Sequence, residues 1–382
     1  MEEHGTRGTD GGSREGEGGR RDDLRTPPVE GRPRLCVLSV AYPLARVGRD
    51  TAGGAEQVLS LLDSALVRLG HRSIVVAAAG STVAGELIEV PLAAGEITDA
   101  ARREAHTRHR QTIRRALAEY RVDLVHMHGV DFHAYLPEGG TPVLVTLHLP
   151  PSWYPPEAFR PGAPNVYLHC VSEAQQRACP VTDRLLRFVP NGVPVGSLGG
   201  PHARRGFSLM LARVCPEKGI HLGLDAARRA GVSLLVGGEV YPYAEHRRYF
   251  ADQVLPRLDR RRRFLGPVGF ARKRRLLAAA RCVLIPSLAP ETSSLVAMEA
   301  IASGTPVVAF RSGALPEVVE HGRTGFLVAD EREMADAIGA VGSLDPEACR
   351  EAGRARFSAE VMARRYVEQY ARVLRAAETA CV

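Results

Sequence analysis

Two successive series of short apolar runs, separated by helical patterns, constrain this chain more than any other feature. The first series comprises residues 35–40, 73–78, 124–128, 143–148 and 167–172. The second comprises residues 208–214, 233–237, 263–265, 282–286 and 306–310. Apolar runs of this length that alternate with helices are typical of parallel sheets covered by helices. We therefore predict an α/β protein of two doubly wound, Rossmann-like domains that face a central cleft.

The boundaries between the parts follow from composition. The chain has 382 residues, more than one hydrophobic core usually organises. Residues 1–32 are rich in Gly, Glu, Asp and Arg, so we expect a disordered tail, and without an apolar core that tail is no signal peptide. A small, basic, Gly-rich stretch at residues 195–206 predicts the hinge. The expected domains are residues 33–197 and 198–357, and a helix within 358–382 is free to pack back on the first domain.

Several function classes are disfavoured by composition. No apolar run approaches the roughly 18 residues of a membrane span, so we expect no transmembrane anchor. Seven scattered cysteines without metal-ligand spacing suggest reduced thiols in the cytoplasm. The net charge is +7, and no nucleic-acid signature accompanies it, so we expect no nucleic-acid partner. For the basic clusters at residues 260–263 and 272–275 we favour a solvated face, and a binding surface is the alternative.

The most informative segment is PETSSLVAMEAIASGTP, residues 290–306, which follows an apolar run. Thr292 and Ser293 are N-cap candidates for a helix over residues 294–303. The free amides of Ser294, Leu295 and Val296 would then form an anion site at the positive end of that helix. Glu291 precedes the helix and Glu299 lies about two turns later, so the two acids can serve different parts of one ligand.

A second basic constellation is LARVCPEKG, residues 211–219. Arg213 ends an apolar run and Lys218 starts the next helix, so both charges would meet at the carboxyl edge of the sheet. Together they can neutralise a diphosphate and stabilise it as a leaving group. The chain has two lysines, Lys218 and Lys273, against 48 arginines, which hints that a compact charge is needed here.

These two segments resemble the E-x7-E signature and the phosphate clamp of the family-4 retaining glycosyltransferases, which have the two-domain GT-B fold. The resemblance covers most of the chain from about residue 34, including GALPEVVEHGRTGFLV at residues 313–328. It implies that Glu291 contacts the donor sugar and that Glu299 binds the ribose. It implies a clamp of Arg213 and Lys218, with Ala212 in place of the usual Gly. The C-terminal domain would then hold the nucleotide sugar, with Ser293, Ser294, Leu295 and Val268 in the donor site.

The N-terminal domain adds candidates on the acceptor side. The sequence AGGAEQV places Gly53 and Gly54 just before a helix, where backbone can approach a ligand closely. It resembles the family's G-G-x-E loop beside the donor diphosphate, which adds Glu56. His148 ends the run PVLVTLH and, by the same resemblance, lies near the sugar and the β-phosphate. It can act there by charge or by hydrogen bonding.

Two further features keep alternative interpretations. His126, Met127, His128, Asp131 and His133 suggest a metal site, but no third ligand has recognisable spacing, so we expect no metal there. The loop PPSWYPPEAF carries Trp153 and Tyr154, which either stack on an acceptor sugar or cover the core.

The resemblance implies a retaining transfer from a UDP- or GDP-sugar to the hydroxyl of a small-molecule, saccharide or lipid-linked acceptor. No covalent nucleophile stands out and no DxD follows the tail, so we expect departure and attack on one face without a metal cofactor. An epimerase or phosphorylase of the same fold, or an inactive binding protein, stays open as an alternative. Peripheral membrane contact and oligomeric state stay open as well.

Overall fold

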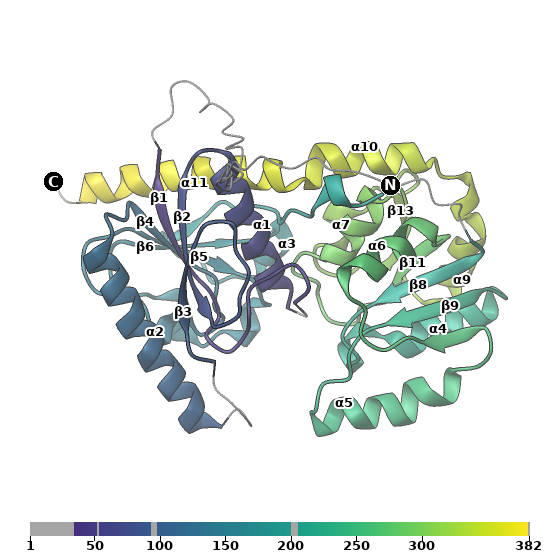
Figure 1. Ribbon diagram of the computed structural model, residues 1–382. Coiled ribbons are helices and arrows are strands. Elements are labelled where there is room, and N and C mark those ends of the chain that lie inside the picture. The colour runs from purple at the N-terminus through teal and green to yellow at the C-terminus, as the bar shows by residue number, and fades with distance from the viewer. Residues whose placement is uncertain (1–33, 52, 93–97, 200–204, 381–382) are drawn as a thin grey trace, which may run out of the picture.

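The computed structural model describes residues 34–51, 53–92, 98–199 and 205–380. Within these ranges the chain forms two α/β domains joined side by side (Figure 1). The predicted tail at residues 1–32, and part of the predicted hinge, lie outside the described residues.

The N-terminal domain is built on a seven-stranded parallel sheet of order β3-β2-β1-β4-β5-β6-β7. Its strands are β1 (Cys36–Val40), β2 (Arg72–Ala78), β3 (Glu86–Val90), β4 (Leu124–Met127), β5 (Val143–Leu147), β6 (Val166–Cys170) and β7 (Leu185–Leu186). Its helices are α1 (Gly54–Arg68), α2 (Asp99–Glu119) and α3 (Glu173–Ala178). Strands β1, β4, β5 and β6 are buried along their whole length, which explains their mostly apolar sequences, each with one buried polar residue.

The C-terminal domain repeats this design with a six-stranded parallel sheet of order β10-β9-β8-β11-β12-β13. Its strands are β8 (Phe207–Leu211), β9 (Ser233–Gly237), β10 (Arg262–Phe264), β11 (Cys282–Ile285), β12 (Val307–Phe310) and β13 (Gly325–Val328). Its helices are α4 (Ile220–Arg229), α5 (Ala244–Tyr249), α6 (Phe270–Ala279), α7 (Leu295–Ala302), α8 (Leu315–Val318), α9 (Glu331–Ala340) and α10 (Pro346–Phe357).

The last helix returns to the first domain. Helix α11 (Ala359–Ala380) continues from α10 and lies along the N-terminal domain, shown in yellow in Figure 1. Its apolar side chains share a buried cluster with those of α1 and the first sheet, and Met362, Tyr366, Tyr370 and Val373 belong to that cluster. Because α11 follows the C-terminal domain in the chain and packs in the core of the N-terminal domain, it links the two domains.

The two doubly wound sheets confirm the predicted fold class, and each of the ten apolar runs overlaps a strand. The edge strands β3, β7 and β13 were not predicted. Strand β3 is partly exposed, and its sequence ELIEV lacks the continuous apolar character of the inner strands. Among the helices that the structure describes, none has the length and apolar character needed to cross a bilayer.

Candidate active site

Both sheets change winding direction at a central pair of strands, β1 beside β4 and β8 beside β11. In such sheets ligands bind outside the carboxyl ends of the strands, next to this switch point. The segments that follow β1, β5, β8 and β11 carry Gly53, His148, Arg213 and Glu291 respectively. The topology therefore brings the main sequence candidates to the carboxyl ends of the two sheets.

Lys218 and Glu291 meet although 73 residues separate them. The Lys218 Nζ atom lies 2.5 Å from Glu291 Oε1, and Ser287 Oγ also donates to that carboxylate. Lys218 ends the short 3₁₀ turn η5 (Pro216–Lys218), and Gly219 follows with a φ of +59°. A Cβ atom on Gly219 would lie 2.1 Å from the carbonyl oxygen of Pro286, so glycine is needed to bring the turn against the segment after β11.

A second lysine–glutamate pair joins α6 to α7. Lys273 Nζ lies 2.5 Å from Glu299 Oε1, and the two side chains are 13% and 3% exposed. Burial raises the pKa of Glu299, while the Lys273 ammonium opposes that rise. The other oxygen, Glu299 Oε2, is buried and has no hydrogen-bond partner in the described part of the chain. Lys273 was not among the predicted site residues, and its rarity in this Arg-rich sequence was the available signal.

The start of α7 differs from the prediction. Its N-cap is Ser294, neither Thr292 nor Ser293, and Ser294 has a left-handed backbone with a φ of +62°. No side chain caps this helix, and Ser293 Oγ is buried without a partner among the described residues. Thr292 Oγ1 instead donates to the carbonyl oxygen of His148 in the other domain, at 3.0 Å. No side chain therefore satisfies the first amides of α7, which can bind a ligand. The strained backbone of Ser294 lies at the same position.

The Gly53–Gly54 loop reaches the same helix. A Cβ atom on Gly54 would lie 3.3 Å from Cδ1 of Leu295, the first residue of α7. The Glu56 carboxylate folds back over Gly53, and burial raises its pKa. Just upstream, Asp50 Oδ1 accepts a hydrogen bond from the amide of Phe270 at 2.6 Å. The N-terminal loop thus touches the C-terminal domain at two helix starts, α6 and α7.

Arg213 and Val268 lie on the C-terminal side of the cleft. Arg213 is exposed, and no carboxylate of the described residues forms a salt bridge with it. Its guanidinium is therefore free to bind an anion. Val268 packs close to the end of β9, where a Cβ atom on Gly237 would lie 2.7 Å from Cγ2 of Val268.

The surroundings of His148 favour the uncharged form of its imidazole. Burial, and to a smaller extent the neighbouring His169, lower its pKa to about 3. Its Nε2 atom lies 3.1 Å from Nδ1 of His128. Of the two predicted modes of action, this lowered pKa favours hydrogen bonding over charge.

The histidine run on β4 forms a hydrogen-bonded network. His126 contacts Tyr370 of α11 at 2.8 Å and Thr146 of β5 at 2.7 Å. Asp131 is held by His106 and Tyr135 instead of facing the histidines. The three residues of the described chain whose potential ligand atoms lie close enough to hold a metal ion are in the C-terminal domain: Cys215, Glu217 and His246.

Trp153 and Tyr154 have different environments. Trp153 is 50% exposed, whereas Tyr154 is 6% exposed and packs in the N-terminal core. The Tyr154 hydroxyl accepts hydrogen bonds from the amides of His148 and Leu149. Tyr154 is therefore not available for the predicted stacking on an acceptor and instead holds the chain at His148, while Trp153 stays accessible.

Two Rossmann-like domains with a polar, cationic site at their facing strand ends define the GT-B class of proteins. The model of the Glycosyltransferase Family 4 matches residues 52–195, and the model described as Glycosyl transferases group 1 matches residues 207–343. The chain therefore belongs to the family-4, group 1 glycosyltransferases.

Individual relatives agree with this assignment. A D-inositol 3-phosphate glycosyltransferase of Nocardioides sp. is 31% identical over 224 residues, which are 57% of this chain and 40% of that protein. AviGT4, a glycosyltransferase involved in avilamycin A biosynthesis, superposes with a TM-score of 0.69 at 25% identity, covering 89% of this chain and 98% of that one. The sucrose-phosphate synthase of Thermosynechococcus elongatus gives a TM-score of 0.73 at 21% identity over 90% of this chain and 100% of that chain.

Proposed function

We propose that this chain is a retaining glycosyltransferase that moves a sugar from a UDP- or GDP-sugar to a hydroxyl acceptor. The observation that carries the proposal is the pairing of both glutamates of the E-x7-E segment with the two lysines of the chain, beside the uncapped start of α7. The proposal divides the donor among three groups of residues, one for the diphosphate, one for the ribose and one for the sugar.

The diphosphate is assigned to Arg213, Lys218 and the first amides of α7. An ammonium carries three donors, so Lys218 can keep its contact with Glu291 and still donate to a phosphate oxygen. Arg213 brings an exposed guanidinium without a carboxylate partner in the described chain. The helix start adds partial positive charge and free N–H groups. These groups supply the field that a departing diphosphate needs without a divalent cation.

The ribose is assigned to Glu299. One carboxylate oxygen is fixed by Lys273, and the buried second oxygen is free to accept hydrogen bonds from ribose hydroxyls. An ionised acceptor makes such bonds stronger than neutral ones. Lys273 acts here as a positioning residue, because it holds the carboxylate in one orientation.

At the reacting centre Glu291 contacts the sugar, and the neutral His148 side chain faces it as a hydrogen-bonding group. The bond between the anomeric carbon and the diphosphate oxygen breaks, and the acceptor oxygen bonds to that carbon from the same face. The acceptor proton passes to the leaving phosphate oxygen, so no covalent enzyme intermediate is needed. The acceptor approaches from the N-terminal domain, near Trp153. The six cysteines of the described residues are buried and form no disulfide with one another, which suits a reducing compartment such as the cytoplasm.

A thermal-shift screen of the full chain against UDP, GDP, ADP and TDP tests the donor assignment. A ligand at 100 times its dissociation constant adds about 2.7 kcal/mol of stability. We expect stabilisation by UDP or GDP, and no stabilisation by any nucleotide would refute the donor site. Donor consumption is then measured with and without acceptors. Acceptor-dependent release of the nucleotide with α-linked product from an α-linked donor supports the transfer, whereas acceptor-independent isomerisation of the donor sugar indicates an epimerase.

A further inference from the structure

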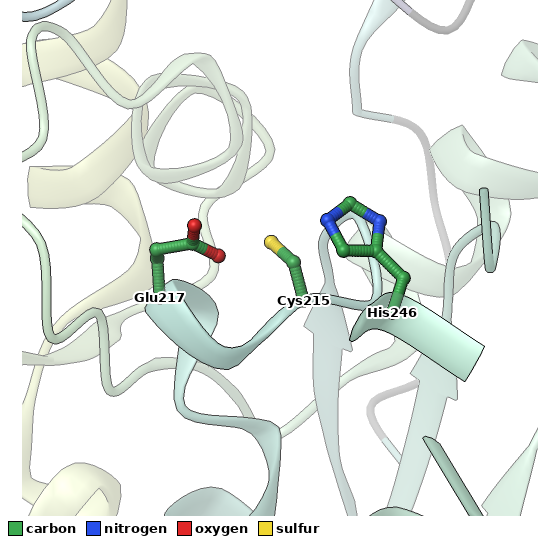
Figure 2. Close-up of side chains that lie close together, drawn as sticks. All are labelled: Cys215, Glu217 and His246. Atoms are coloured by element: carbon green, nitrogen blue, oxygen red, sulfur yellow. The ribbon is translucent and has the colours of Figure 1, made fainter. Parts of the chain in front are cut away.

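A cluster of three potential metal ligands lies in the C-terminal domain, next in the chain to Arg213 and Lys218 but made of other residues. Cys215 and Glu217 come from the turn after β8, and His246 comes from α5. One ligand atom from each residue lies within 4.8 Å of the other two. Figure 2 shows the Cys215 sulfur between the Glu217 carboxylate and the His246 ring, with one ring nitrogen turned toward the sulfur.

The cluster has binding capacity that the described protein atoms do not use. Cys215 is 1% exposed, and its sulfur makes a long contact of 3.8 Å with the carbonyl oxygen of Arg213. Glu217 Oε2 is a buried atom without a hydrogen-bond partner among the described residues. A buried carboxylate oxygen left unpaired is destabilising, so Glu217 Oε2 favours a bound partner.

The backbone holds two of the ligands firmly. The carbonyl oxygen of Glu217 accepts a hydrogen bond from the amide of Leu288 at 2.8 Å, which ties the turn to the segment after β11. Gly219, in its left-handed conformation, ends the turn. The sulfur and the carboxylate are thus presented by one rigid turn, and His246 closes the group from a separate helix.

We propose that Cys215, Glu217 and His246 form a binding site for Zn²⁺ or a similar soft divalent cation. Zinc binds Cys sulfur at about 2.3 Å, His nitrogen at about 2.0 Å and carboxylate oxygen at about 2.0–2.2 Å. In a tetrahedral site these lengths place the ligand atoms roughly 3.3–3.6 Å apart. Small rotations of the side chains close the present spacing to that value. Sulfur and imidazole ligands exclude Mg²⁺ and Ca²⁺ as natural occupants.

Zinc binding at this site is accompanied by the release of one proton. The Cys215 thiol releases its proton to solvent as the S–Zn bond forms, and the neutral imidazole and the carboxylate donate lone pairs. Three protein ligands leave the fourth position to a water molecule. Glu217 directly precedes Lys218, so the ion would stiffen the turn that presents Lys218. The metal site does not depend on the proposed transfer activity.

The test uses the full chain, freed of metal by a chelator and kept reduced, and titrated with CoCl₂ and then with ZnCl₂. We expect one equivalent of Co²⁺ to give the near-ultraviolet absorption of a thiolate–cobalt bond, and Zn²⁺ to displace it. Cys215→Ser should abolish that absorption. His246→Ala should weaken metal binding by at least about tenfold, since even residues behind the ligands contribute that much.

Cys282→Ser is the matched control, because it removes a buried cysteine of the same domain that lies on β11, outside the cluster. This variant should keep the absorption and the affinity. Far-ultraviolet circular dichroism checks that each variant is folded, and His246→Ala serves if Cys215→Ser is not. The proposal is overturned if stoichiometric Co²⁺ gives no thiolate absorption, or if the absorption and affinity are the same in both ligand variants as in the parent. Nucleotide binding is measured separately, so either proposal can fail alone.

Discussion

Replacing Lys273 by Met tests the buried pair that orients Glu299. The substitution keeps most of the side-chain volume and removes the charge 2.5 Å from a carboxylate that is 3% exposed. Breaking a buried pair by removing one partner costs about 3–5 kcal/mol, because an uncompensated charge remains inside. For a domain of this size that corresponds to a fall in melting temperature of about 6–20 °C.

The loss should depend on pH. Burial already raises the pKa of Glu299 in the folded chain, and Lys273 opposes that rise. Without Lys273 the folded-state pKa moves further up, so the folded protein binds a proton that the unfolded chain at the same pH does not. Stability then falls as pH rises through the interval between the unfolded and the folded pKa. The difference between Lys273→Met and the parent should accordingly shrink as pH is lowered.

The assay is urea unfolding followed by far-ultraviolet circular dichroism at several pH values. The double variant Lys273→Met with Glu299→Gln should be more stable than Lys273→Met alone, because it removes the unpaired charge. The control is Arg68→Met, which breaks the exposed Arg68–Glu360 pair and should cost less than about 1 kcal/mol. A loss in Lys273→Met that is equal at every pH and unrelieved in the double variant would refute the reasoning.

Four further predictions concern the site. Glu299→Ala should weaken nucleotide binding by about 1.5–3 kcal/mol in calorimetry, and unchanged affinity would remove Glu299 from the ribose site. Lys218→Ala should lower turnover far more than the melting temperature, whereas equal effects would mark a structural lysine. Turnover should persist in excess EDTA and fall steeply in Arg213→Ala. Loss of activity on chelation, with recovery in Mg²⁺ or Mn²⁺, would contradict the cationic clamp. The same assay in Cys215→Ser separates any effect of bound zinc. Gly219→Ala should cost at least about 1–2 kcal/mol for its left-handed backbone, measured by thermal unfolding, and a neutral effect would show that the turn can relax.

Local sequence patterns predicted some residues of the site and missed others. Arg213, Lys218 and Glu291 were expected at the carboxyl edge of the sheet because they follow apolar strands, and Glu299 was expected from the resemblance to the E-x7-E signature. The start of α7 was not, since Ser294 takes a left-handed conformation that a serine rarely adopts, and the expected caps serve other contacts. For Tyr154 the sequence left stacking on an acceptor and covering the core as alternatives, and the structure buries it in the core with its hydroxyl on the amide of His148.

The sequence by itself determined the two doubly wound domains and the positions of their inner strands along the chain. Strands that are buried on both faces are short apolar runs, and these runs alternate with helical patterns in the sequence. Only the tertiary structure decided which charges meet. The partners Lys218 and Glu291, Lys273 and Glu299, and His126 and Tyr370 are 73, 26 and 244 residues apart. The first pair forms because parallel strands end at one edge, the second because α6 packs on α7, and the third because α11 crosses to the first domain. Spacing along the chain carries no record of that arrangement, so side-chain partners at the cleft follow from the fold.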